Sequence, residues 1–283
     1  MEMFNFSSGE TARFNRALTF VHRQELDIEL SGANTLIIKT ENFEDECEQL
    51  APYFSGLGLE NANARLVFNP AKGGSHKILV NKAAISKLSY IHTMVTELVH
   101  LGHLLSYNAE CGNIYRFTQD QAIAEHYYEF LLWTKFQAMK VATRAHALVS
   151  WHEVNGEDAP VGGCYQFAEV NFYSERVAAA LVALQGAGSI AVWREGLWDL
   201  LEELAFYLGR LAFYQQTARP WELDEGFPAA AIEAMVGQDN CLALCAALQQ
   251  AKEYSLWQEQ KRNIRKAILA MQEHGKGLFA PGA

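Results

Sequence analysis

The sequence has no run of lysine and arginine residues, and its acidic residues outnumber its basic ones. Its 283 residues include 33 aspartates and glutamates against 23 lysines and arginines, for a formal net charge of −10 at pH 7. Such a chain is repelled overall by nucleic-acid backbones and anionic membrane surfaces, so we expect no general binding of nucleic acid. No stretch approaches eighteen consecutive apolar residues, and we expect no membrane-spanning segment.

Cysteine is scarce and scattered. The five residues are Cys47, Cys111, Cys164, Cys241 and Cys245. An odd, dispersed set is typical of reduced thiols and not of a disulfide framework. The first residues also lack a basic segment followed by an apolar stretch, so we expect no secretory signal. Together these features predict a cytoplasmic protein, with a bacterial or phage setting as the expectation.

Several familiar catalytic motifs are missing. No Gly-x-Ser-x-Gly occurs, so a serine nucleophile of the α/β-hydrolase type is unsupported. The segment GLGLENAN lacks the third glycine and the strand-to-helix setting of a dinucleotide fingerprint, and AKGGSHK is not a Walker loop. These absences leave the common nucleotide and esterase sites without support.

What the sequence does contain is β-strand signal before about residue 83 and helical periodicity after it. The strand-like runs are DIELSG, NTLIIKT, ARLVFNP and HKILVNK, and paired glycines in AKGGS predict a hairpin loop between the last two. A short helix is expected over about 41–54. We therefore predict an α+β fold, in which a small N-terminal sheet with a hairpin is followed by a mainly helical body.

The helical part divides into two regions. Apolar residues at three- and four-residue steps predict a long helix over about 83–107, and a capping box at Thr118 and Gln121 predicts a second over about 118–153. The segment NGEDAPVGGC is a predicted loop, and further helices are expected over about 165–275. We predict an α/β lobe of residues 1–160 and a helical C-terminal lobe of residues 161–283.

The segment Thr96-Glu97-Leu98-Val99-His100 differs only at its first residue from the His-Glu-x-x-His helix signature of zinc peptidases. In that signature two histidines one turn apart bind zinc, and the glutamate activates the metal-bound water. Here threonine occupies the first ligand position. A second imidazole would have to come from His103, because His92 lies two turns from His100, too far to share an ion.

The segment ELVHLGH, preceded by the strand pair of residues 64–82 and followed by a second long helix, resembles the zincin metallopeptidase superfamily. The resemblance covers about residues 60–140 and implies a zincin-like core in the first lobe. It also implies a third metal ligand, a glutamate, on the second long helix, in a context similar to residues 133–138. Lys135 stands at that position, and its ammonium group repels a divalent cation.

The resemblance thus implies a degenerate zincin, because a zinc site with one remaining ligand is not stable. Such a pseudoenzyme would act as a binding or regulatory protein, with a protein partner and no cofactor. Families of this appearance often travel on phages and other mobile elements.

The residues leave other interpretations open. In a rebuilt zinc site, His100 and His103 would combine with second-helix ligands and Glu97 would act as general base, giving a metal-dependent hydrolase. The candidate ligands on the second helix are Glu125, His126 and Glu129. The histidines are alternatively structural. A carboxylate-bridged di-iron bundle is disfavoured, since Glu-x-x-His occurs only once.

Two aromatic regions of the predicted helical lobe suggest contacts beyond a single lobe. The pair Phe206–Tyr207 repeats seven residues later, which favours a helix seam against the first lobe or against a second copy of the chain. Trp193 and Trp198 lie near a helix start, where exposed tryptophans would anchor a protein partner. A homodimer formed through the helical lobe is a further prediction.

Overall fold

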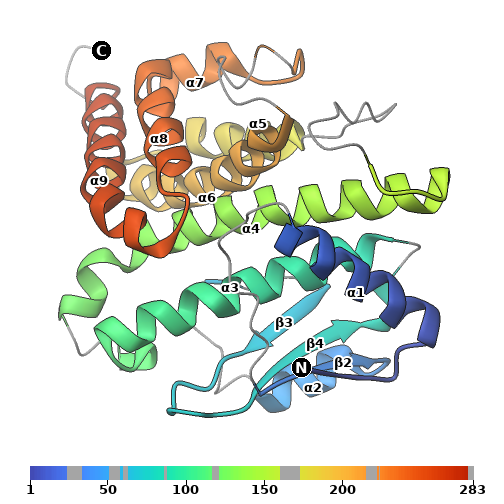
Figure 1. Cartoon of the computed structure of the whole chain (residues 1–283). Coiled ribbons are helices and arrows are strands. Elements are labelled where there is room, and N and C mark those ends of the chain that lie inside the picture. Colours follow the sequence, from blue (N-terminus) through green and yellow to red (C-terminus); the bar gives the residue numbers. More distant parts are fainter. Residues whose placement is uncertain are drawn as a thin grey trace. The chain divides into compact units, whose positions relative to one another are not determined.

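The structure is a computed structural model, and it describes residues 1–23, 34–50, 58–59, 63–85, 88–116, 121–159, 173–214, 222 and 224–279 (Figure 1). The chain forms two compact units. The first comprises Met1–Tyr127 and Val141–Gln166, and the second comprises Tyr128–Lys140 and Phe167–Ala283. The central turns of one long helix therefore belong to the second unit, an assignment that the sequence did not indicate.

The first unit contains a four-stranded sheet with the strand order β1-β2-β4-β3. Strands β1 (Glu2–Phe4), β2 (Thr35–Thr40) and β4 (His76–Asn81) are parallel, and β3 (Ala64–Val67) pairs antiparallel with β4 at one edge. Ile37 of β2 lies opposite Ile78 of β4, and both side chains are fully buried. The predicted sheet and hairpin are confirmed, whereas the expected strand DIELSG lies outside the described residues.

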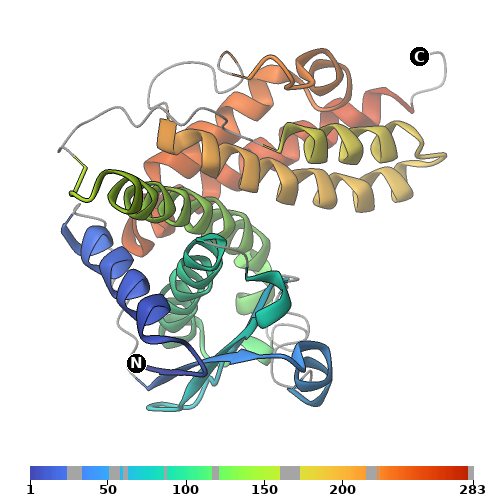
Figure 2. The same cartoon turned by 90° about the vertical axis from the view of Figure 1, so that its right-hand side faces the viewer.

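Three helices and the two ends of a fourth complete this unit: α1 (Ser8–Arg23), α2 (Phe43–Leu50), α3 (Ser89–Cys111) and α4 (Gln121–Asn155). Helix α3 packs against β3 and β4, and α1 lies on the same side of the sheet (Figure 2). A capping box starts α1, because the Ser7 N–H donates to the Glu10 carboxylate at 2.7 Å and the Glu10 N–H donates to the Ser7 hydroxyl at 3.3 Å.

The second unit is helical. Besides the central part of α4 it contains α5 (Ser174–Gln185), α6 (Ile190–Tyr214), α7 (Ala229–Met235), α8 (Gln238–Gln250) and α9 (Tyr254–Gly277). Helices α5 and α6 lie side by side, as do α8 and α9. The Trp133 indole N–H and the Gln137 amide of α4 both donate to the carbonyl of Ala251, at 2.5 Å and 2.7 Å. These bonds tie the centre of α4 to the connection between α8 and α9.

Two helices of this unit approach closely at Gly209. A Cβ atom there would lie 2.3 Å from the carbonyl oxygen of Phe136 on α4, which is far inside contact distance. Only glycine therefore permits this separation between α6 and α4.

The α+β class is confirmed, although some element bounds differ from those expected. Strand β1 and helix α1 were not predicted. The first long helix begins at Ser89, after the short 3-10 turn η2 (Lys82–Ala84), and not near residue 83. No single helix in the described ranges is long and apolar enough to cross a membrane, while α7 and α8, bent by 100°, meet that criterion only as a pair.

Candidate functional site

The segment Thr96–His103 of helix α3, on which the zincin resemblance rests and which is called the zincin-like segment below, contains the candidate ligands of this helix and is largely buried. The exposed fraction is 0 % for Glu97, 3 % for Thr96 and His100, and 5 % for His103. The adjoining residues Val95, Leu98, Val99 and Leu101 are also buried. Residues 93–101 are all buried, so this stretch of α3 is enclosed on all sides and belongs to the core. Glu97 therefore lies among core side chains.

The states of two polar side chains of this segment, Thr96 and His103, are determined by their immediate surroundings. The Thr96 hydroxyl donates to the backbone carbonyl of His92, one turn earlier, at 2.9 Å. Burial lowers the pKa of His103 to about 3, so its imidazole is neutral at pH 7. A hydroxyl bonded to its own helix is not arranged to replace the missing imidazole ligand.

The candidate ligands of α4 divide between the two units. His126 is half-buried in the first unit, and Glu125 lies on α4 with its side chain outside the described part of the chain. Glu129 belongs to the second unit, where its buried carboxylate accepts from the Arg265 guanidinium of α9 at 2.6 Å. That carboxylate is thus engaged with a cation of its own unit.

Lys135, at the position where the resemblance implies a glutamate ligand, is a buried cation. Its ammonium lies 2.6 Å from the carboxylate of Glu202 on α6 and 5.3 Å from the ring centroid of Phe206. A paired ammonium in the interior cannot coordinate a metal ion. Its partners are other residues of the second unit, which gives Lys135 a structural role there.

The residues of the implied zinc site do not fit a zinc ion. Within the described ranges, no group of three or more His, Cys, Asp and Glu side chains is gathered closely enough to hold a metal. Thr96 and Lys135 supply a hydroxyl and an ammonium where imidazole and carboxylate are needed.

A histidine pair in the first unit was not predicted. The ring centroid of His146 on α4 lies 6.5 Å from that of His92 on α3. The Thr143 hydroxyl lies 3.5 Å from Nε2 of His92. Sequence spacing could not reveal this cluster, because it forms between two helices that are separated in the chain.

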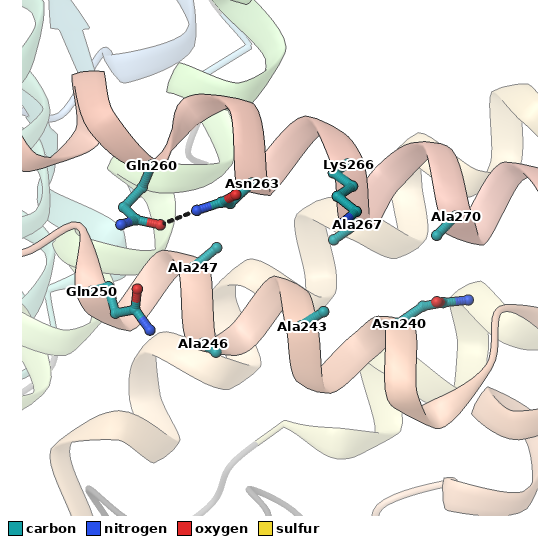
Figure 3. Close-up of a pocket in the computed structure, with 10 residues that line it drawn as sticks. All are labelled: Asn240, Ala243, Ala246, Ala247, Gln250, Gln260, Asn263, Lys266, Ala267 and Ala270. Atoms are coloured by element: carbon teal, nitrogen blue, oxygen red, sulfur yellow. Dashed lines mark hydrogen bonds between the residues drawn. The ribbon is translucent and has the colours of Figure 1, made fainter.

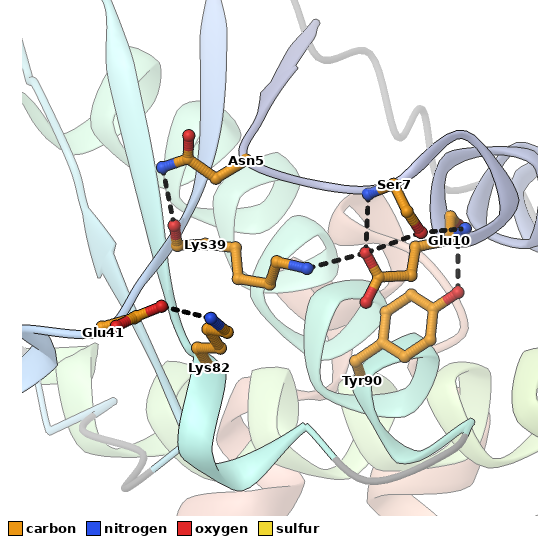
Figure 4. A network of polar contacts seen from close by, with 7 residues as sticks. All are labelled: Asn5, Ser7, Glu10, Lys39, Glu41, Lys82 and Tyr90. Carbon is orange, nitrogen blue, oxygen red and sulfur yellow. Dashed lines mark hydrogen bonds and ion pairs between the residues drawn. The ribbon is translucent and has the colours of Figure 1, made fainter.

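A polar pocket of about 420 Å³ lies at the carboxyl end of the parallel strands (Figure 4). Its lining comes from the segment after β1, the end of β2, the start of α2 and the residue after β4, namely Asn5, Lys39, Thr40, Glu41, Asn42, Glu46 and Lys82. Lys39 pairs with Glu10 at 2.7 Å, Lys82 pairs with Glu41, and the Thr40 hydroxyl donates to Glu46 at 2.6 Å. These residues were missed because their proximity depends on strand order.

Burial and hydrogen bonding act in opposite directions on Glu10, beside this pocket. Burial raises the pKa of the Glu10 carboxyl, but hydrogen bonds from Lys39 and Ser7 outweigh that effect and the pKa is lowered. The carboxylate therefore stays charged next to the Lys39 ammonium.

The second unit has a shallow groove of about 350 Å³ between α8 and α9 (Figure 3). Alanines line much of it: Ala243, Ala246 and Ala247 from α8, and Ala267 and Ala270 from α9. The remaining lining side chains are amides and one lysine, Lys266. The groove offers small apolar contacts but few groups for specific chemistry.

The aromatic residues singled out in the sequence have distinct environments in the second unit. Trp193 is fully buried, so it is not an exposed anchor. Trp198 is half-buried, and its ring stacks on Tyr128 at 4.6 Å, with Tyr128 51 % exposed. Tyr207 is buried and stacks on Phe227 at 4.8 Å, while the side chain of Tyr214 lies outside the described part. Of the two tryptophans, only Trp198 is accessible in part, and it stacks on the exposed Tyr128.

No family model, curated protein or solved structure matches this chain.

Proposed function

We propose that this chain is a non-catalytic binding protein with a zincin-like core, in which the motif helix stabilises the fold instead of holding a metal. The arrangement of the first unit supports a core of this type. An antiparallel edge strand, β3, precedes α3, and α3 packs against β3 and β4. This is the sheet edge that the resemblance places before the motif helix.

The observation that carries the proposal is the burial of Glu97 together with His100 and His103. A glutamate that activates a water molecule has to reach both water and substrate. Glu97 has no exposed surface. The ion pairs of Glu129 and Lys135 within the second unit add to the argument, because both side chains are already used in packing.

We further propose that the binding partner is a protein and that Tyr128 and Trp198 contribute to its recognition. Stacked aromatic rings combine a large apolar area with polar edges, and both residue types are enriched at the energetic centres of interfaces.

A cytoplasmic location is part of the proposal. It is supported by Cys47, Cys241 and Cys245, which are free thiols, as expected in a reducing compartment.

The homodimer through the helical lobe is also retained as a proposal. Two aromatics of the expected seam contribute contacts inside the second unit, where Phe206 lies near Lys135 and Tyr207 stacks on Phe227. Light scattering of the purified protein measures the oligomeric state directly. A monomer at all concentrations would contradict the homodimer.

Metal analysis of protein purified without chelator tests the loss of the zinc site. The matched variants are His100→Ala and, as control, His274→Ala in α9. We expect less than about a tenth of an equivalent of zinc per chain in all three proteins. Near-stoichiometric zinc that is lost only in His100→Ala would instead establish the rebuilt site and the metal-dependent hydrolase.

Co-purification from the native host tests the binding function. Wild-type protein is compared with Trp198→Ala and with Val182→Ala, a control that changes an exposed residue of α5. We expect a stoichiometric protein partner that is retained by the control and lost from Trp198→Ala. A partner retained equally by all three would remove the aromatic pair from the interface, and recovery of none would contradict a stable partner.

A further inference from the structure

The polar pocket of the first unit lies where ligand sites are commonly found in sheets of this kind. Strands β1, β2 and β4 are parallel, so their carboxyl ends meet at one edge. In open α/β sheets, ligands bind in crevices outside the carboxyl ends of the strands. Asn5 follows β1 directly, Thr40 ends β2 and Lys82 follows β4, and all three line the pocket.

The backbone at the pocket is in the left-handed region at one residue, Asn5. Asn5 has a φ of 65°, in the left-handed region, which asparagine adopts more often than most other residues with a side chain. Its side-chain amide donates to the carbonyl of Lys39 at 2.9 Å, which links the ends of β1 and β2 (Figure 4). Conformations of this kind are concentrated at binding sites, where the surrounding structure holds them in place.

The charges of the lining define what the pocket can accept. Its ionisable residues are two lysines and two glutamates, so it has no excess of either sign. The Lys39–Glu10 pair is largely enclosed, with side chains 12 % and 21 % exposed, whereas the Lys82–Glu41 pair is 53 % and 71 % exposed. An exposed ion pair contributes little to stability, so little is lost when its two groups pair with a ligand instead. A ligand with one negative and one positive group can replace the contact between Lys82 and Glu41. Its negative group would pair with Lys82 and its positive group with Glu41, so that neither side chain is left unpaired.

Two other ligand classes fit less well. A phosphate at the start of α1 would meet the Glu10 carboxylate, which already accepts from the Ser7 N–H and hydroxyl. A nucleobase would need an aromatic or apolar face, and all the lining residues are polar. The arrangement favours a small polar molecule that has one positive and one negative group.

We propose that this pocket binds a small zwitterion of the α-amino-acid class. The ligand carboxylate pairs with Lys82 and its ammonium group pairs with Glu41, while the Lys39–Glu10 pair stays intact. The pocket shares no residue with the zincin-like segment of α3. The proposal therefore stands or falls independently of the proposed loss of metal chemistry.

Titration of ¹⁵N-labelled protein with L-alanine, L-glutamine and L-arginine tests this site. We expect saturable shifts of the backbone amides of Asn5, Thr40 and Asn42 with at least one of these probes. For the best probe, the N-acetyl derivative lacks the α-ammonium and the α-carboxamide derivative lacks the α-carboxylate. We expect each derivative to bind at least about tenfold more weakly, because each loses one of the two ion pairs.

Variants locate the binding. Lys82→Met and Glu41→Gln change exposed side chains and should each weaken binding by about tenfold. Lys72→Met, which changes an exposed lysine in the turn between β3 and β4, is the matched control and should bind as the wild type does. The proposal is overturned if no probe gives saturable shifts up to its solubility limit. Undiminished binding of the N-acetyl derivative, or undiminished binding to both pocket variants, overturns it equally.

Discussion

Replacing His103 by leucine should remove much of the pH dependence of the free energy of unfolding. The imidazole lies in the core of the first unit, and burial lowers its pKa to about 3 from the ordinary value of 6.5. The unfolded chain therefore binds a proton at a pH where the folded chain does not. Leucine fills a similar volume and cannot be protonated.

The size of the effect follows from the two pKa values. Because the pKa is lower in the folded state, this contribution is fully present above about pH 6.5, declines as the pH falls below that value, and levels off near pH 3. Between pH 7.5 and pH 5.0 the unfolded state gains about 2 kcal/mol from protonation of this residue. The value at pH 5.0 hardly changes if the folded pKa is one unit higher.

Urea unfolding at pH 7.5 and pH 5.0 measures this difference. Between these pH values, His103→Leu should lose about 2 kcal/mol less stability than the wild type. His274→Leu, a change in α9 outside the first unit, is the control and should follow the wild type. Some pH dependence will remain, since burial also lowers the pKa of His76. Equal pH dependence of wild type and His103→Leu would show that His103 is not held neutral by burial.

Two further predictions concern the helix contact at Gly209 and the zincin-like segment. Gly209→Ala should destabilise the protein by about 2 kcal/mol in chemical denaturation, because its Cβ would lie 2.3 Å from the Phe136 carbonyl oxygen. Gly9→Ala, with nothing within 4 Å of the added atom, should be neutral or stabilising by up to about 1 kcal/mol, and a similar loss in both variants would contradict the steric explanation. Thr96→His alone should yield no peptidase activity in a fluorogenic peptide assay, because Lys135 still occupies the implied third-ligand position. Robust activity would show that the third ligand lies elsewhere.

The elements that could be predicted are those with strong local signals. Helix α3 has apolar residues at helical spacing, and the hairpin of β3 and β4 has paired glycines between its strands. Strand β1 has only three residues, and it exists because it pairs with β2, which is distant in the sequence. The capping box of Ser7 and Glu10 is a local sequence pattern from which the start of α1 could have been predicted.

The site was less predictable than the fold. Periodicity places Glu97, His100 and His103 on one helix, but whether that helix faces solvent depends on the elements packed around it. The role of Lys135 depends on Glu202, a residue of another helix. The polar pocket depends on strand order, which brings Asn5, Thr40 and Lys82 together although they are far apart in the chain.

The division of α4 between the two units has a consequence for making fragments of this protein. A fragment ending at residue 160 would end in an apparent loop, yet it would lack Ala251, the acceptor for Trp133 and Gln137, and Trp257, whose ring lies 5.9 Å from that of Trp133. A fragment starting at residue 161 would lack Tyr128–Lys140, the part of α4 that belongs to the second unit. Fragments for expression or recombination should therefore not be made by dividing the chain between residues 160 and 161.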